Sequence, residues 1–397
     1  LYSGLLEDPD VQEVLKRSDL TITDQELKAY DINSKSIPDY SIQAMRSLLI
    51  YAVEEALFTE ADRIEPIHIF LAITKVFDAP QKLLKSENSS MKVLRGVVRL
   101  SINERRRRES VSYFNPSTPY YRTGGVAKSW IYGYTYVLNH FSWDVNLKAA
   151  EQQDRFGIGH ENEVESLVAI LGRPSKKNAL LIGEAGVGKS SLIKGVAQKI
   201  NRGNVPPQLL DKRIVQLDIN GLIAYASRNK NLEDTLQSAI AELTKAGNTI
   251  LFIDEMQELV PAKADESGHS LAGILIPYVV ESKFPIVGTV NYADYKKYFY
   301  TNESFRQSFS NIEVAELSVA DTIRILETKI TPLEDTFRIY ITYPAIVASA
   351  ELAQRYVTNR MLPDSAVNVL EAACSWAQAN GVDLLTSEHI AKSVSLQ

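Results

Sequence analysis

The segment Gly183–Ser190 has the residue types that a phosphate-binding loop requires. It reads GEAGVGKS and fits the pattern G-x-x-x-x-G-K-[ST]. Glycines let backbone N–H groups curl around phosphates, and the N-terminus of the following helix adds a favourable dipole. We expect Lys189 to contact the β- and γ-phosphates and the Ser190 hydroxyl to bind Mg²⁺. A chance glycine-rich turn is the alternative, but an apolar strand before the loop and a helix after it argue against chance.

A second motif with chemical potential lies about sixty residues downstream. In ILFIDE, four apolar residues precede two carboxylates, Asp254 and Glu255. Open α/β sheets bind their ligands at the carboxyl ends of strands, where these two side chains would emerge. Asp254 is expected to hold Mg²⁺ directly or through water, and Glu255 to polarise the water that attacks the γ-phosphate. An apolar run that ends in Asp-Glu is weak evidence for an ATPase site by itself, and it becomes strong evidence when a phosphate-binding loop precedes it at this distance.

A polar amide follows the next predicted strand. The sequence FPIVGTVN ends at Asn291. On a strand beside that of Asp254, this amide could orient the same water molecule. The alternative is a simple cap at the end of the strand.

The elements that must position these residues alternate between strand and helix over residues 150–318. Buried strands are predicted at Asn178–Ile182, Arg213–Leu217, Thr249–Ile253 and Phe284–Thr289. Helices are predicted at Ser191–Ile200, Leu232–Leu243 and Leu271–Val280. This order predicts an α/β fold, a parallel sheet with helices on both faces.

Three further regions surround this α/β domain. Residues 1–110 are predicted to be a helical domain, since Ser41–Val76 has apolar residues at helical spacing. Residues 111–149 are rich in Gly, Pro and aromatic residues and predict an extended linker arm, either a strap packed on a neighbouring surface or a set of stacked aromatics for a ligand. Residues 319–397 predict a small all-helical domain, with helices starting near Ser318, Pro344, Pro363 and Ser387.

Composition excludes several classes of protein. The 397 residues carry a net charge of −6, which gives no support for a general nucleic-acid or anionic-membrane surface. The four arginines Arg105–Arg108 are expected to be a solvated helix face rather than a phosphate or acidic-partner site. A single cysteine, Cys374, excludes an internal disulfide framework and fits a reducing compartment, so we expect a cytoplasmic protein. The chain begins at Leu1, so an upstream targeting or membrane segment stays open.

On these motifs the chain resembles the Clp-type AAA+ protein unfoldases, in particular their first ATPase module. The similarity runs roughly from Leu138 to the C-terminus. It includes FGIGHENEVESLVAIL, which looks like the family's adenine-seating segment, NALLIGEAGVGKSSLIKGVAQKI, and ITYPAIVASAELAQRYVTNRMLPDSAVNVLEAA. Residues 41–76 are similar to one repeat of the family's helical N-terminal domain.

The resemblance implies a nucleotide site and an assembly. ATP with Mg²⁺ would lie between subunits of a ring, a hexamer in this family, and hydrolysis would drive pore loops that pull on a client polypeptide. Ile158 and Gly159 would lie against adenine, and Asp364 would stand near the nucleotide entrance on the lid helix. No nucleic-acid partner or membrane contact is implied. The expected nucleotide-binding residues are Ile158, Gly159, Glu184, Ala185, Gly186, Val187, Gly188, Lys189, Ser190, Ser191 and Asp364.

The sequence departs from the family pattern at two functional positions. In AYASRNKN, Arg228 stands where the family has its pore-loop aromatic residue, and Tyr225 is the nearest substitute. In SFRQSFS, Gln307 and Ser308 replace a pair of arginines, so Arg306 becomes the candidate arginine finger. The long coiled-coil insert of the disaggregase branch is missing, and the given sequence ends where the family's second ATPase module would begin, so whether such a module lies outside this chain stays open.

Three hypotheses about function follow from these residues. The first is an active ATPase that remodels proteins, supported by the complete set of ATP-positioning residues. The second is a nucleotide-dependent assembly or regulatory scaffold with weak or no hydrolysis, supported by the unusual pore loop and the displaced arginine. The third, a nucleic-acid motor, is opposed by the charge distribution. His160, where the family usually has Arg, is expected either to touch the nucleotide or to be a surface residue.

Overall fold

The structure is a computed structural model, and most of the chain is described. The described residues are 5, 8–18, 42–59, 61, 63–76, 91–110, 135–151, 156–229, 232–259, 275, 277–279, 281, 283–300, 303–358 and 360–395. The chain divides into two compact units. One comprises Pro119–Ile325 and Val357–Ser365, and the other comprises Leu1–Thr118, Leu326–Tyr356 and Ala366–Gln397. Among the described helices, none is both long enough and apolar enough to cross a bilayer.

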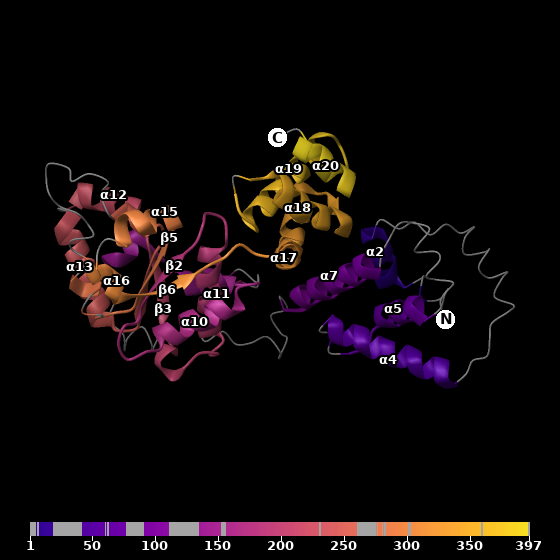
Figure 1. Ribbon diagram of the computed structural model, residues 1–397, viewed down its shortest axis with the longest axis horizontal. Helices are drawn as coiled ribbons and strands as arrows, with labels where there is room; N and C mark the ends of the chain where they lie inside the picture. The colour runs from indigo at the N-terminus through magenta and orange to yellow at the C-terminus, as the bar shows by residue number, and fades with distance from the viewer. Residues whose placement is uncertain are drawn as a thin grey trace. The chain divides into compact units, whose positions relative to one another are not determined.

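A six-stranded sheet forms the centre of the first unit, with strand order β1-β3-β4-β5-β2-β6 (Figure 1). The strands are β1 Ser142–Asp144, β2 Asn178–Ile182, β3 Arg213–Leu217, β4 Thr249–Ile253, β5 Ile286–Val290 and β6 Phe309–Glu313. All neighbouring pairs are parallel except β1 with β3, which are antiparallel. The predicted parallel sheet is therefore confirmed, with one antiparallel strand added at its edge.

The predicted strands agree closely with the observed ones in the middle of the sheet. Strands β2, β3 and β4 have the predicted bounds, while β5 begins two residues later, at Ile286. The two edge strands β1 and β6 were not predicted. Their sequences, SWD and FSNIE, lack the continuous apolar run that marks the central strands.

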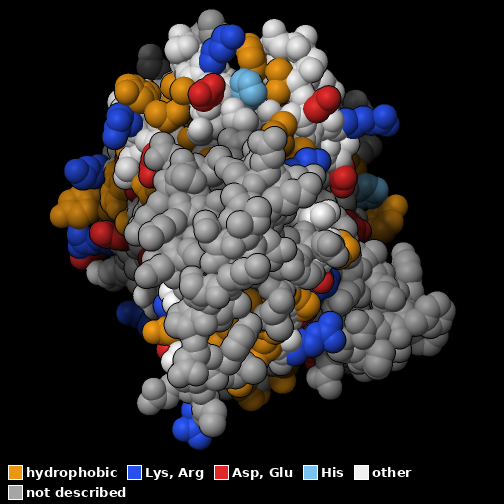
Figure 2. Space-filling model, turned by 90° about the vertical axis from the view of Figure 1, so that its right-hand side faces the viewer, with side chains coloured by type: hydrophobic (Ala, Val, Ile, Leu, Met, Phe, Trp, Pro, Cys, Tyr) orange, Lys and Arg blue, Asp and Glu red, His pale blue; other side chains and the backbone are white. Residues whose placement is uncertain are grey.

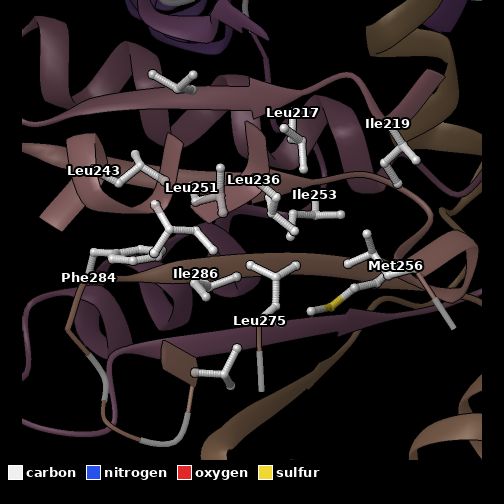
Figure 3. Close-up of a cluster of buried hydrophobic side chains, with 14 of the residues drawn as sticks. Leu217, Ile219, Leu236, Leu243, Leu251, Ile253, Met256, Leu275, Phe284 and Ile286 are labelled. Carbon is white, nitrogen blue, oxygen red and sulfur yellow. The ribbon is translucent and has the colours of Figure 1, made fainter. Parts of the chain in front are cut away.

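Helices cover both faces of the sheet because the central strands are apolar on both sides. Helices α9 Val145–Glu151, α10 Glu161–Leu171 and α11 Lys189–Asn201 pack with one set of strand residues. Helices α12 Ile219–Asn229 and α13 Leu232–Ala246 pack with the other set. Figure 3 shows this second core, where Leu236 and Leu243 of α13 meet Leu251 and Ile253 of β4. Adjacent residues of one strand thus enter different cores, as strand geometry requires.

Residues 135–149 of the predicted linker arm lie along the edge of this unit. The Glu242 carboxylate accepts the N–H groups of Val137 and Leu138 at 3.0–3.1 Å, at the start of the short helix η2 Leu138–Phe141. Farther along, the Asn146 side chain accepts the Ile214 N–H at 2.8 Å. These bonds fasten the segment to α13 and β3. Residues 111–134 of the arm lie outside the described residues.

The second unit contains the C-terminal helices, which begin where the sequence predicts. Helix α17 Val319–Phe337 leads into this unit and is followed by α18 Tyr343–Tyr356, α19 Asp364–Ala379 and α20 Ser387–Ser395. The expectation of a purely helical region needs one correction, because β7 Tyr340–Ile341 and β8 Leu384–Leu385 pair in parallel. The pair closes because the buried Thr342 hydroxyl donates to the Leu385 carbonyl at 2.8 Å.

The N-terminal helices belong to the same unit as the later part of α17. They are α2 Pro9–Arg17, α4 Ile42–Phe58, α5 Pro66–Val76 and α7 Met91–Ser110. Arg99 of α7 pairs with the buried Glu327 of α17 at 2.6 Å. Arg105 pairs with Asp10 at 2.7 Å and Glu65 at 2.9 Å, so it is not the solvated residue that the arginine run predicts. The side chains of residues 106–108 lie outside the described ones.

Candidate active site

The backbone of the Gly183–Ser190 loop has the conformation that its glycines permit. Gly186 and Gly188 have φ values of +87° and +100°, a region that costs L-residues with a Cβ free energy. A Cβ added at Gly183 would lie 2.5 Å from the Val314 carbonyl oxygen of the segment after β6. Val187 is buried, while Glu184 and Ala185 are exposed and Ser191 is half-buried. The loop is therefore anchored at Val187 and open at its tip.

Lys189 lies within this loop as its cation. Its Nζ donates to the carbonyl oxygens of Gly183 and Glu184, each at 2.8 Å. Burial lowers the pKa of Lys189, and the negative charges of Asp254, Glu184 and Glu255 oppose that shift. A partly desolvated ammonium at the mouth of a helix N-terminus is a strong partner for phosphate oxygens.

The structure brings Ser190 and Asp254 together from two distant parts of the chain. Ser190 Oγ donates to Asp254 Oδ2 at 2.9 Å. The contact arises because β4, β5 and β2 are neighbours in the sheet and all end at the same edge. A hydroxyl and a carboxylate are the hard oxygen ligands that Mg²⁺ prefers, usually completed by waters and substrate phosphates. Among the described residues, no group of three or more His, Cys, Asp or Glu side chains is placed to hold a metal ion.

Glu255 is exposed beside this pair. It has a φ of +51°, which is uncommon for a residue with a Cβ, and its N–H donates to Thr289 Oγ1 at 2.9 Å. Desolvation raises the pKa of the nearby Glu258, and the charges of Glu255 and Asp254 raise it further. Negative charge is thus concentrated next to the loop, at a place that solvent water reaches.

Asn291 stands at the carboxyl end of β5, between the ends of β4 and β2. Its Oδ1 accepts the Asp294 N–H at 2.7 Å, and its Nδ2 donates to Asp294 Oδ2 at 2.8 Å. It therefore caps the short helix α15 Tyr292–Asp294. The predicted alternative, that Asn291 is a cap at the end of the strand, is therefore observed. One hydrogen of Nδ2 is used in this cap, and the other is available to a water molecule.

The segment around Ile158 and Gly159 packs closely near the start of α17. Gly157 and Gly159 have φ values of +74° and +77°. A Cβ on Gly159 would lie 2.7 Å from Leu317 and 2.9 Å from Asp321. His160 is buried, and its Nε2 lies 2.8 Å from the Val187 carbonyl oxygen, so it bonds the nucleotide loop and is not a surface residue. Nε2 must carry the proton, since a carbonyl only accepts.

Asp364 lies directly against the loop. Its N–H donates to the Gly186 carbonyl at 3.4 Å, and a Cβ on Gly186 would lie 2.8 Å from Asp364 Cβ. The structure adds Arg360, whose Nη1 donates to Asp364 Oδ2 at 3.0 Å. Arg360 was not predicted, because a charged residue in a loop carries no signal in the sequence that it lies close to Asp364.

Arg306 is not in this group. It lies on α16 Glu303–Ser308, and its guanidinium stacks over the Tyr300 ring at 5.5 Å from the ring centre. Because β6 runs parallel to β2 with Phe309 opposite Asn178, Arg306 precedes the amino end of β6. The nucleotide loop follows the other end of β2, about 16 Å away along five strand residues. Arg306 and the chain's own loop therefore lie at opposite edges of the sheet.

Tyr225 does not project as a pore aromatic residue would. Its ring stacks on His140 at 5.0 Å and packs against Phe141 at 5.6 Å between ring centres. The half-buried side chain packs against the core formed by α12, α13 and the sheet. The suggestion that Tyr225 substitutes for the family's pore residue is therefore not supported in this conformation. The side chain of Arg228 lies outside the described residues.

Known protein families match the two parts of the chain that surround this site. Residues 179–296 match the ATPase family associated with various cellular activities, AAA. Residues 318–392 match the AAA lid domain family. The two matches meet at the loop, because Asp364 of the lid region is the residue that packs on Gly186.

Among the relatives with curated names are ClpB chaperones and a homologue of ClpA, the ATP-binding subunit of an ATP-dependent Clp protease. The chain is 37% identical to the chaperone protein ClpB of Helicobacter hepaticus over 238 residues, 60% of this chain and 28% of the relative. ClpB of Bdellovibrio bacteriovorus is 32% identical over 309 residues, 78% of this chain and 34% of the relative. The ClpA homologue of Guillardia theta is 36% identical over 61% of this chain and 30% of the relative. The chain thus spans about a third of the length of these relatives.

Solved structures show the same fold. The S. cerevisiae Hsp104–ADP complex matches with a TM-score of 0.61 and 30% identity, over 65% of this chain and 45% of that one. The extended Hsp104:casein complex of S. cerevisiae matches with a TM-score of 0.57 and 29% identity, over 63% and 43%.

Proposed function

Since the chain holds an AAA ATPase domain with an AAA lid domain, and is similar there to Clp-type chaperones, we propose that it binds ATP with Mg²⁺ and hydrolyses it to remodel other proteins. The observation that carries the proposal is the 2.9 Å bond between Ser190 and Asp254. It joins the phosphate loop to the acidic strand end at the sheet edge where Lys189 and Glu255 also lie. A chance glycine-rich turn would not bring those four side chains together.

Each side chain has a separate task in the proposed reaction. Lys189 offsets charge on the β- and γ-phosphate oxygens, and Ser190 with Asp254 would hold the metal ion. Bound there, Mg²⁺ neutralises charge on the transferred phosphoryl group. Glu255 accepts a proton from the attacking water as the bond between the γ-phosphorus and the bridging oxygen breaks. Asn291 orients that water through its second amide hydrogen.

The assembly and the client are also proposals. Two of the similar solved structures hold Hsp104 with casein, and one of these also holds ATPγS, so we propose a polypeptide client for this chain. We further propose a homo-oligomeric ring in which Arg306 reaches the nucleotide of the neighbouring subunit. The position of Arg306, at the sheet edge opposite its own loop, supports a role between subunits. Among the coloured side chains of Figure 2, Lys and Arg lie interspersed with Asp and Glu.

A second function, a nucleotide-dependent scaffold with slow hydrolysis, is favoured by one observation. Tyr225 is packed on His140 and Phe141, and this arrangement leaves it unsuited to gripping a chain in a pore. ATP binding alone could then hold an assembly together, while the hydrolytic residues act slowly.

Steady-state ATP hydrolysis of the protein and of Glu255→Gln separates the two functions. The remodelling enzyme predicts measurable turnover that falls about 10²–10⁴-fold in Glu255→Gln, with ATP binding retained. The scaffold predicts tight ATP binding and negligible turnover in both proteins. Measurable turnover that is equal in the two proteins would refute the role of Glu255, and no binding at millimolar nucleotide would refute both functions.

A further inference from the structure

The hydroxyl of Thr289 connects the two acidic residues of the site. Thr289 is fully buried on β5, and its Oγ1 donates to Asp254 Oδ1 at 2.5 Å. The same oxygen accepts the N–H of Glu255 at 2.9 Å. The directions of both bonds are fixed, since a carboxylate can only accept and an amide can only donate. One buried hydroxyl thus holds both the carboxylate expected to bind metal and the backbone of the residue expected to act on water.

We propose that Thr289 is the positioning residue for the Asp254–Glu255 pair, and that metal-dependent nucleotide binding and turnover both depend on its hydroxyl. The inference rests on the proposed function and extends it to a residue of β5 that does not itself face the substrate. Its sequence signal is weak, a single hydroxyl in a strand that is otherwise apolar or glycine.

The hydroxyls of Thr289 and Ser190 divide the Asp254 carboxylate between them. Ser190 bonds Oδ2 at 2.9 Å and Thr289 bonds Oδ1 at 2.5 Å, which fixes the plane of the carboxylate. A bound metal would use a lone pair of Ser190 Oγ, and the Ser190 O–H could still donate to Asp254. Ser190 would then serve the metal and the carboxylate together, whereas the Thr289 O–H serves the carboxylate alone. Outer partners of this kind typically contribute 10–100-fold to metal affinity or activity.

The second bond acts on the backbone of Glu255. At a φ of +51°, this residue occupies the left-handed region, which is unfavourable for a residue with a Cβ. The hydrogen bond from its N–H to Thr289 holds that conformation at the partly buried end of β4. Without the acceptor, the N–H would be unpaired and the turn after Asp254 would be free to relax. The position of the Glu255 side chain relative to the loop would change with it.

Thr289→Val and Thr289→Ser test the proposal as a pair, because valine has the shape of threonine without the hydroxyl and serine keeps the hydroxyl. The affinity for ATPγS is measured by calorimetry in Mg²⁺ and in excess EDTA, and kcat and KM are measured with ATP. Thr289→Val is expected to lose about 10-fold or more of the affinity that Mg²⁺ adds, and a similar factor in kcat. Its affinity in EDTA should equal that of the unaltered protein, and Thr289→Ser should recover most of both losses.

Thr249→Val is the matched control. Thr249 is a buried threonine at the amino end of β4, and its hydroxyl bonds Asn248 and Arg213 at 3.3–3.4 Å. It should lower the Tm as a structural change does, while leaving the metal dependence and kcat unchanged. Normal metal dependence and kcat in Thr289→Val would overturn the proposal. Losses of affinity and kcat that match the change in Tm, and that Thr289→Ser does not recover, would overturn it as well. Failure of the proposed function looks different, since the unaltered protein would then bind no nucleotide.

Discussion

At the scale of single residues, the site is a balance of one cation and several carboxylates. Burial lowers the pKa of Lys189, and the charges of Asp254 and Glu255 keep it from falling further. The ammonium is bound to two loop carbonyls at 2.8 Å, so a phosphate would exchange neutral acceptors for charged ones. We infer that the loop orients the Lys189 ammonium before a ligand binds, and that the net free energy of phosphate binding comes from the negative charge of the ligand.

Lys189→Ala is expected to weaken ATP binding about 100-fold or more, because it removes a charge-assisted hydrogen bond to the phosphates. Titration calorimetry with ATP and Mg²⁺ measures the loss. Lys148→Ala serves as the control. Lys148 is on α9, with its ammonium over the ring of Trp143, and it is not part of the Gly183–Ser190 loop. Equal affinities in Lys189→Ala and the unaltered protein would place the phosphates elsewhere.

At the scale of elements, three strand ends carry the site. The loop follows β2, the carboxylates follow β4, and β5 lies between them with Thr289 and Asn291 at its end. Because all three strands are parallel and buried on both faces, their ends have little freedom to separate. A rigid sheet edge therefore sets the distances on which metal and water positioning depend.

The contact between α4 and α5 contains a histidine that predicts pH dependence. The Glu65 N–H donates to His68 Nδ1 at 2.9 Å, so Nε2 holds the proton that bonds Thr59 at 2.9 Å. Burial lowers the pKa of His68, the charges of Glu65 and Glu55 raise it, and Arg105 lowers it. A lowered pKa in the folded state means that this stabilisation is present above the ordinary value of 6.5 and is lost as the pH falls below it.

We therefore expect residues 42–76 to open more readily between pH 7 and pH 5. Amide hydrogen exchange of this segment, corrected for the intrinsic rate at each pH, measures the effect. His68→Asn is the control, because asparagine can accept the Glu65 N–H and does not titrate. Protection that falls equally in both proteins over this range would show that other groups cause the change.

At the scale of the whole molecule, two kinds of long-range contact matter. Within one unit, ion pairs join the N-terminal helices to α17, through Arg99 with Glu327 and Arg17 with Glu334. Between subunits, the proposed ring would bring Arg306 of one chain to the loop of the next. The first contact is described by the structure, and the second stays a proposal.

Arg306→Ala is expected to keep ATP affinity and to lower turnover by about 10³-fold, the contribution typical of an arginine finger. Because Arg306 would act on a neighbour, mixing Arg306→Ala with Glu255→Gln should restore part of the ATPase activity. An interface has both residues intact where the Arg306→Ala subunit supplies the nucleotide site with Glu255 and the Glu255→Gln subunit supplies the arginine. Gln307→Ala on the same helix is the control, and a mixture no more active than its parts would argue against a shared site.

The pair of Arg99 and Glu327 should be energetically coupled, because the Glu327 carboxylate is only 4% exposed. A double-mutant cycle with Arg99→Met and Glu327→Gln is expected to give about 1–3 kcal/mol from denaturant unfolding. The same cycle on the more exposed pair Lys75 and Glu54 should give about 0.5 kcal/mol or less. Similar coupling energies in the two cycles would mean that burial does not strengthen the contact of α7 with α17.

The sequence predicted the parts of the fold that local patterns encode. Apolar runs gave β2, β3 and β4 their bounds, and helix starts near Ser318, Pro344, Pro363 and Ser387 were confirmed within two residues. The edge strand β6 and the β7–β8 pair were missed. The five residues of β6 mix apolar with polar side chains, and β7 and β8 are only two residues long, so these segments become strands because a partner strand lies beside them.

The sequence by itself determined the functional groups that lie together within a single short segment of the chain. The glycines, Lys189 and Ser190 of the loop and the two carboxylates after β4 follow from residue type and spacing, because the loop conformation is local. Only the tertiary structure decided how those segments meet. Three features depend on the order of the strands. They are the hydrogen bond from Thr289 to Asp254, the stacking of Tyr225 on His140, and the position of Arg306 at the ends of the strands away from the loop. Strand order joins residues tens of positions apart, and local periodicity carries no information about it.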